Sequence, residues 1–271
     1  MIESFLITSR ETLEASLVVG IVLAYLGKTE NNKYRGAVFW AIAAGVLFSI
    51  FAAIGFTVIA GGFEGTAEAL FEGITMLVGA ALLTTMIMWM MQQRHITAQI
   101  ESKVAGYVAN PSFSYLGIFL LVFVAIIREG VETVIFMNAI NYASGINFVG
   151  GLLGITVAIG VGYLFFHSAR KMNLKKIFTF SSILLILFAA GLTAHGVHEL
   201  EEAGVLTPFI YPLYDINPIL NEKGIVGSFL KGLFGYNGNP SLLEVICYWL
   251  YLLSVGGWWY TSTRNATSRT Q

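Results

Sequence analysis

The chain of 271 residues is 56% hydrophobic and only 11% charged, with 15 basic and 16 acidic side chains. Globular domains in water carry roughly 25% charged residues, so this composition excludes an ordinary water-soluble enzyme. The near balance of charge also excludes nucleic acid as a partner, because a phosphate backbone is bound by a surplus of Lys and Arg. The single cysteine, Cys247, cannot form an intrachain disulfide or a thiolate metal cage by itself. Any metal site must therefore use oxygen and imidazole ligands.

Apolar segments long enough to cross a bilayer recur along the whole chain. A spanning helix needs about 20 mostly apolar residues, and such segments lie at about 3–26, 36–60, 69–91, 115–140, 147–168, 177–198 and 242–261. We interpret the first as a retained helix rather than a signal peptide, since it lacks a basic leading region and contains Arg10, Glu11 and Glu14. The sequence thus predicts an all-α polytopic protein with seven transmembrane helices in the lipid bilayer.

Lys and Arg are distributed unequally between the loops that join these helices. Eleven of them lie in the first, third and fifth loops and in the tail at 262–271, whereas the other side has only Lys223 and Lys231. Because basic residues accumulate in cytoplasmic loops, we expect the N-terminus outside and the C-terminus in the cytoplasm. The segment at about 199–241 holds four of the five prolines, and we expect an external loop with short structured pieces.

One charged motif occurs twice. The first predicted helix contains Arg10-Glu11-Thr12-Leu13-Glu14, and the fourth contains Arg128-Glu129-Gly130-Val131-Glu132, both with the pattern R-E-x-apolar-E. A repeat of three helices enters the membrane from the opposite side, as the inverted repeats of many transporters do. We therefore predict one membrane domain over residues 1–271, with repeats at about 3–91 and 115–198 and a seventh helix at about 242–261.

The charged residues of each motif share one face of their helix. At about 100° per residue, positions 10, 11 and 14 fall within a narrow arc, as do positions 128, 129 and 132. Each charge at the centre of a span costs roughly 2.5 to 3.5 kcal/mol of insertion free energy. Such residues usually mark a functional site, although a structural ion network is the alternative. Clustered carboxylates suit a hard cation, but they do not choose among iron, manganese and calcium.

Acids and histidines also gather at the predicted outer ends of two helices. They are Glu64, Glu68 and Glu72 at the third helix, and His195, His198, Glu199, Glu201 and Glu202 at the sixth. Among the first three, Glu72 should lie deepest. A histidine pair beside carboxylates is a reasonable site for recruiting a metal ion. The alternatives are a solvated helix start whose acids favour the helix dipole and a hydrogen-bonded interfacial histidine.

In these motifs the sequence resembles the Ftr-type high-affinity iron permeases, the oxidase-dependent iron transporter family with its bacterial EfeU-like members. The resemblance rests on the two repeated motifs, on Phe71-Glu72-Gly73, and on the segment 195–205, which begins with His195 and closes the sixth helix. It implies an iron importer of the plasma membrane or the bacterial inner membrane, not an enzyme. The metal ligands it implies are Glu11, Glu14, Glu129 and Glu132, supported by Arg10 and Arg128. One departure is Thr12, where the family usually has glycine, so that Thr12 either changes helix approach or adds a hydroxyl ligand.

The resemblance also bears on cofactors and partners. Iron, ferric or ferrous, is implied as the transported substrate without a prosthetic group, with help from an extracytoplasmic oxidase or iron-binding protein. The residues alone also fit a permease for another divalent metal, such as manganese or lead. A membrane di-iron oxidoreductase is a weaker alternative, because the motif helices lack the Glu-x-x-His element of such proteins. No oligomeric state is predicted.

Overall fold

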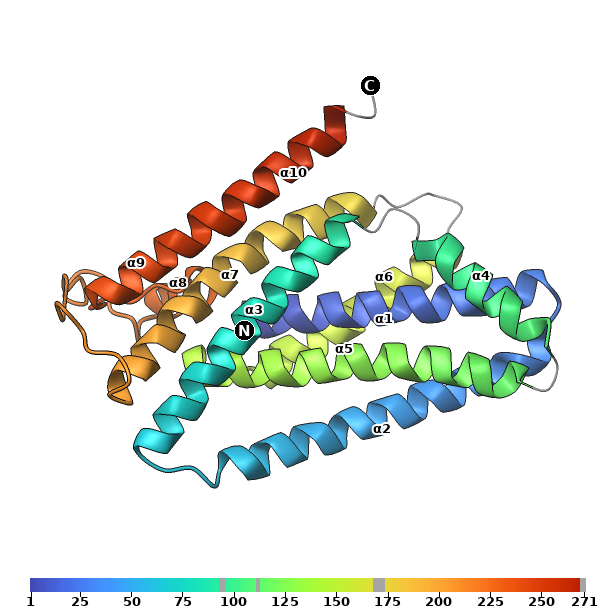
Figure 1. Cartoon of the computed structure of the whole chain (residues 1–271), viewed down its shortest axis with the longest axis horizontal. Coiled ribbons are helices and arrows are strands. Elements are labelled where there is room, and N and C mark those ends of the chain that lie inside the picture. The colour runs from blue at the N-terminus through green and yellow to red at the C-terminus, as the bar shows by residue number, and fades with distance from the viewer. Residues whose placement is uncertain (93–95, 111–112, 168–173, 269–271) are drawn as a thin grey trace.

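The computed structural model describes residues 1–92, 96–110, 113–167 and 174–268, and its regular structure is entirely helical. The helices are α1 Ile2–Lys28, α2 Arg35–Ala60, α3 Thr66–Gln92, α4 Ile96–Val108, α5 Ser114–Ser144, α6 Phe148–His167, α7 Leu174–Glu202, α8 Ile225–Phe234, α9 Leu242–Tyr251 and α10 Gly257–Ser268. In Figure 1 helices α1, α2, α5 and α6 run roughly along the long axis of the molecule, whereas α3, α7 and α10 are inclined to it. A short π-helical segment, Leu252–Gly256, joins α9 directly to α10.

Five of the seven predicted apolar segments lie within single helices. The segment at about 147–168 corresponds to α6, and the segment at about 242–261 runs through α9, the π-helical segment and α10. Within the described residues, five helical segments are long and apolar enough to cross a membrane: Asn32–Ala60, Thr66–Trp89, Phe148–Phe166, Thr179–Glu202 and Leu242–Ser262. The helices that carry the charged motifs, α1 and α5, contain 27 and 31 residues. At 1.5 Å per residue they are about 40 and 46 Å long, longer than the hydrocarbon core of a bilayer. The structure is that of a polytopic membrane protein.

The structure corrects one boundary of the sequence prediction and adds one helix. Residues 199–202, expected in the external loop, form the last turn of α7, and α8 is the structured piece expected within that loop. The third loop contains an unexpected helix, α4, which is too short to span a bilayer and packs Ile100 and Val104 against α1 and α5. Four basic residues used to predict the orientation lie outside the described residues: Arg94, Arg170, Lys171 and Arg269.

Packing divides the core into two apolar clusters. The α3/α7 cluster contains buried residues of α3 and α7 together with Ile7 of α1 and Phe136 of α5. The α2/α4 cluster contains buried residues of α2 and α4 together with Ile21 of α1 and Ile126 of α5. The motifs at positions 10–14 and 128–132 therefore fall between the two clusters on both helices.

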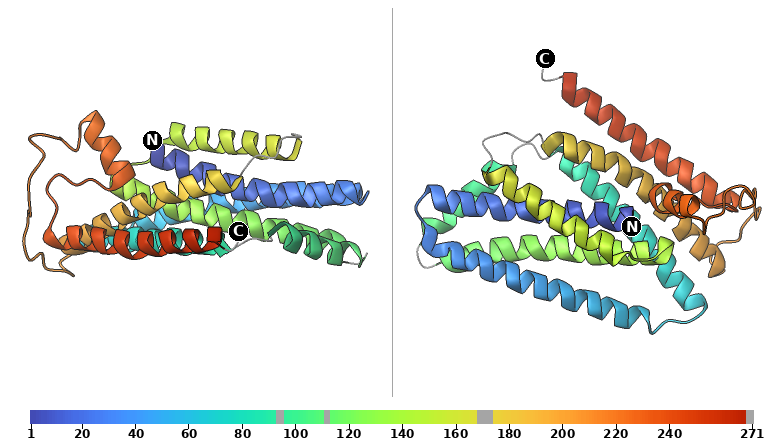
Figure 2. Two further views of the ribbon diagram at one scale, coloured as in Figure 1. Left: turned by 90° about the horizontal axis from the view of Figure 1, so that it is seen from above. Right: turned by 180° about the vertical axis from the view of Figure 1, so that it is seen from behind.

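The most extensive helix contacts pair α1 with α6, α3 with α7, and α2 with α5 (Figures 1 and 2). Between α1 and α6, the hydroxyl of Thr8 donates a hydrogen bond to the backbone oxygen of Gly151 over 2.9 Å. A Cβ atom added at Gly154 would overlap Thr8, and one at Gly162 would press on Ser16. Thr12 lies midway between Thr8 and Ser16 at the same four-residue spacing, which places it on the α6 face of α1.

Replacement of Gly154 by leucine should destabilise the protein, because the new side chain must displace Thr8 or the α1 backbone. Overpacking of this kind costs typically about 1 to 3 kcal/mol. Gly160 on the same helix is the matched control, since a Cβ there meets no atom within 4 Å. We expect Gly154→Leu, but not Gly160→Leu, to lower the apparent melting temperature of the purified protein in detergent. Equal melting temperatures would contradict the close α1–α6 contact.

Candidate metal-transport site

The two charged motifs meet inside the helical bundle. Helices α1 and α5 run in opposite directions and contact each other (Figure 1). Glu11 of α1 and Glu129 and Glu132 of α5 each offer a carboxylate oxygen, and these three atoms all lie within 4.8 Å of one another. With Glu14 and the two motif arginines, they form what we call the central site.

Ion pairs within the central site repeat on the two helices. Arg10 approaches Glu14 at 3.3 Å, and Arg128 approaches Glu132 at 3.7 Å, each with a spacing of four residues. Arg128 also pairs with the adjacent Glu129 and reaches across to Glu14 of α1 at 4.0 Å. The guanidiniums thus offset part of the negative charge and tie the two helices together.

Several carboxylate oxygens of the central site remain without hydrogen-bond partners. Glu11 and Glu129 are buried, and within the described residues neither oxygen of Glu11 nor the Oε2 atom of Glu129 accepts a hydrogen bond. Burial of an ionised carboxylate is costly unless a cation or hydrogen-bond donors compensate it. Converging oxygens of this kind fit a hard metal ion.

The two arginines have different environments. Only 1% of the Arg10 side chain is exposed, against 48% for Arg128. The Arg128 guanidinium lies over the ring of Trp89 from α3, 5.0 Å from its centroid, in a cation–π contact. Trp89 was not predicted as a site residue from the sequence. Nothing in the sequence around an aromatic residue near a helix end indicates that it contacts a distant arginine.

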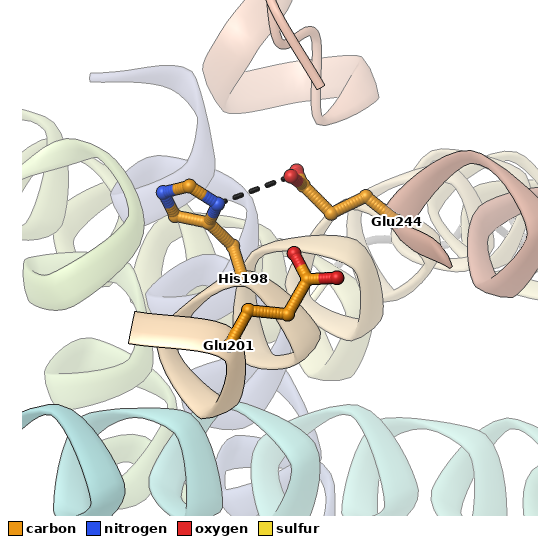
Figure 3. A group of neighbouring side chains, drawn as sticks. All are labelled: His198, Glu201 and Glu244. Atoms are coloured by element: carbon orange, nitrogen blue, oxygen red, sulfur yellow. Dashed lines mark hydrogen bonds and ion pairs between the residues drawn. The ribbon is translucent and has the colours of Figure 1, made fainter. Parts of the chain in front are cut away.

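A second group of possible ligands joins α7 to α9. His198, Glu201 and Glu244 each offer one ligand atom within 4.8 Å of the others (Figure 3). The Nδ1 atom of His198 lies 3.0 Å from a carboxylate oxygen of Glu244. Glu244 was not among the predicted site residues, although Ser241-x-x-Glu244 at the start of α9 has the pattern of a helix capping box, which the structure contains.

The other predicted outer residues lie around this group. Glu72 is close enough to Glu68 and Glu202 to interact with them electrostatically, and Glu199 interacts in the same way with Glu72 and Glu202. His195 belongs to neither ligand group: its ring is buried, and its Nδ1 atom lies 3.0 Å from the backbone oxygen of Gly191. The acids predicted on α3 and α7 thus lie near one another.

Known proteins resemble this chain over most of its length. The sequence pattern of the iron permease FTR1 family matches residues 1–261. The chain belongs to this family. It is 32% identical over 259 residues to the ferrous iron permease EfeU of Yersinia pestis, covering 93% of this chain and 91% of the relative. The ferrous iron permease EfeU of Escherichia coli O6:K15:H31 is 29% identical over 257 residues, 93% of each chain. No solved structure matches the chain.

Membership of the family settles the broad class of the molecule. The chain is a multi-pass membrane permease, a transporter rather than an enzyme, and iron is the substrate that this family transports. The prediction of an iron permease from the repeated motifs is therefore confirmed at the level of the family, and the di-iron oxidoreductase is set aside.

Removal of Arg10 should destabilise this permease more than removal of Arg128. Loss of one partner from a buried ion pair costs about 3 to 5 kcal/mol, because the other charge stays buried without compensation. Arg10 is buried beside Glu14, whereas Arg128 is half exposed. We expect Arg10→Met to lower the melting temperature of the detergent-purified protein well below that of Arg128→Met. Addition of Glu14→Gln should restore part of the loss in R10M, and equal losses for the two arginine variants would contradict the difference in burial.

Proposed function

We propose that this chain imports ferrous iron across a plasma membrane or a bacterial inner membrane, and that the ion passes through the central site. The proposal depends chiefly on one observation: carboxylate oxygens of Glu11, Glu129 and Glu132 converge from two helices within 4.8 Å. Glu14 lies on the same face and contacts both arginines. The four glutamates bind the ion, and Arg10 and Arg128 hold the carboxylates in place between transport events.

The charge of the central site supports a divalent ion. Four glutamates and two arginines, all ionised, give a net charge of −2, which a single ferrous ion neutralises. The relatives from Yersinia pestis and Escherichia coli are named ferrous iron permeases. Because all of these ligands are carboxylates, the site itself discriminates weakly between ferrous iron and other divalent ions such as manganese. Family membership is what favours iron.

Helix packing supports an inverted repeat. If α1, α2 and α3 correspond to α5, α6 and α7, the close pair α1/α6 corresponds to the close pair α5/α2. The pairs α1/α5 and α3/α7 each correspond to themselves. This exchange is what a pseudo-two-fold axis in the membrane plane produces, with the substrate site near the midplane between the repeats. The basic loops favour an orientation with the N-terminus outside.

The helix spacing supports a packing role for Thr12 rather than a role as a ligand. It shares a helix face with Thr8 and Ser16, which contact α6, and this face is turned away from Arg10 and Glu14. Residues Gly154, Ala158 and Gly162 of α6 repeat at the same spacing. The first motif has Thr12 at the position where the second motif has Gly130. Small residues on α6 nevertheless let α1 approach α6 closely.

Uptake of labelled ferrous iron into intact cells tests the proposal. Glu11→Gln and Glu132→Gln should each reduce uptake to the level of cells without the protein, because each removes a charged ligand while keeping the size of the side chain. Glu64→Gln is the matched control, since it removes the same charge from an exposed position outside both ligand groups. Amounts of protein in the membrane are compared in parallel.

Two results would contradict the proposal. Normal iron uptake by E11Q and E132Q, with normal amounts of each variant in the membrane, would show that iron does not pass through the central site. Preferential uptake of manganese or lead over iron by the unmodified chain would be compatible with transport through the central site, but it would show that iron is not the preferred substrate.

A further inference from the structure

The outer end of α7 presents a histidine whose orientation is fixed by a buried carboxylate. His198 faces Glu244 through its Nδ1 atom at 3.0 Å, and Glu244 is itself held on both oxygens. Its Oε1 atom accepts a hydrogen bond from the backbone N–H of Ser241 at 2.9 Å, and its Oε2 atom accepts one from the amide of Asn237 at 2.8 Å. These bonds leave Glu244 little freedom to move.

This arrangement determines which ring nitrogen of His198 is available to a ligand. A carboxylate accepts hydrogen bonds, so Nδ1 carries the proton, and Nε2 has a free lone pair when the imidazole is neutral. A histidine that donates one N–H to a carboxylate and offers the other nitrogen is the usual form of a metal-binding histidine. The free nitrogen points away from Glu244 in Figure 3. Glu244 therefore acts here as a positioning residue rather than as a ligand.

The Nε2 atom of His198 faces an exposed carboxylate on the next turn of the same helix. It lies 3.5 Å from Oε1 of Glu202, which is longer than a normal N–H···O hydrogen bond. Two neighbouring ligands, each about 2.1 Å from one metal ion, are separated by roughly 3.0 to 3.4 Å. The side chains of His198 and Glu202 are 25% and 61% exposed, so a hydrated ion can reach both.

The surroundings of this pair are negatively charged. Glu72 and Glu199 both interact electrostatically with Glu202. Lys231 also interacts with Glu199, but its ammonium group pairs with Glu222 at 3.7 Å. A cation bound between His198 and Glu202 would therefore be stabilised by neighbouring carboxylates.

We infer that the Nε2 atom of His198 and the carboxylate of Glu202 bind a divalent first-row transition metal ion at the outer end of α7, with Glu244 fixing the imidazole. Imidazole together with carboxylate suits Fe²⁺, Mn²⁺, Co²⁺ or Zn²⁺. This outer site shares no residue with the central site. Its role in loading ions for transport rests on the proposed function, but its existence does not.

The difference in ligand chemistry makes the outer site separately measurable. The central site contains carboxylates, whereas the outer site includes an imidazole. With the purified full chain in lipid nanodiscs, Co²⁺ serves as the probe metal. A cobalt-bound imidazole gives a strongly shifted exchangeable N–H proton resonance, and the affinity is followed by equilibrium dialysis.

We expect the shifted resonance in the unmodified chain, in Glu64→Gln and in Glu132→Gln, and its loss in His198→Gln. Glu244→Gln should weaken Co²⁺ binding at this site by about 10- to 100-fold, as the loss of outer-shell partners typically does. Glu64→Gln removes a carboxylate from an exposed position outside both ligand groups, and it should leave the affinity unchanged. His198→Gln alone tests whether His198 binds the metal ion, because this partly exposed side chain can be replaced without leaving a cavity in the core.

Persistence of the resonance in H198Q, or its loss in E132Q, would overturn the inference. An affinity in E244Q equal to that in E64Q would refute the positioning role. Iron uptake separates the two proposals: H198Q should be impaired at low iron and recover at high iron, whereas E132Q should not recover. Normal uptake by E132Q with an intact Co²⁺ resonance would refute the central site and leave the outer site standing.

Discussion

Charges buried between apolar helices are the constraint on which the rest of the structure depends. Neither α1 nor α5 can place its motif against lipid without a large cost in free energy, so each helix needs the other. Arg128 of α5 reaches Glu14 of α1, and Glu11 lies beside Glu129 and Glu132. The apolar clusters on either side of this charged layer then fix its depth along both helices.

The same constraint explains how much the sequence could predict. Long apolar segments and two copies of an unusual charged motif are strong signals. They predicted the membrane-spanning helices, the class of membrane protein and the family. The motif spacing also predicted that Arg10, Glu11 and Glu14 share a face. These features depend on residues close together in the chain, where helical periodicity relates position to direction.

Features that depend on distant contacts were harder to predict. The cation–π contact of Arg128 with Trp89 joins two helices, and the bond from His198 to Glu244 joins residues 46 positions apart. Helix α4 was missed because a 13-residue amphipathic helix does not reach the length of a span. His195 was grouped with His198 by spacing alone, whereas its ring turns to the backbone of its own helix.

The exchange of partners between the two proposed repeats restricts how this molecule can move. Helix α1 packs most closely on α6, and α5 packs most closely on α2, so the first two helices of each half are interleaved with those of the other. Separating the halves as rigid bodies would pull glycine-lined contacts apart at Gly45, Gly130 and Gly154. A motion that preserves these contacts must carry α1 together with α6 and α2 together with α5, so that each moving unit contains helices from both proposed repeats.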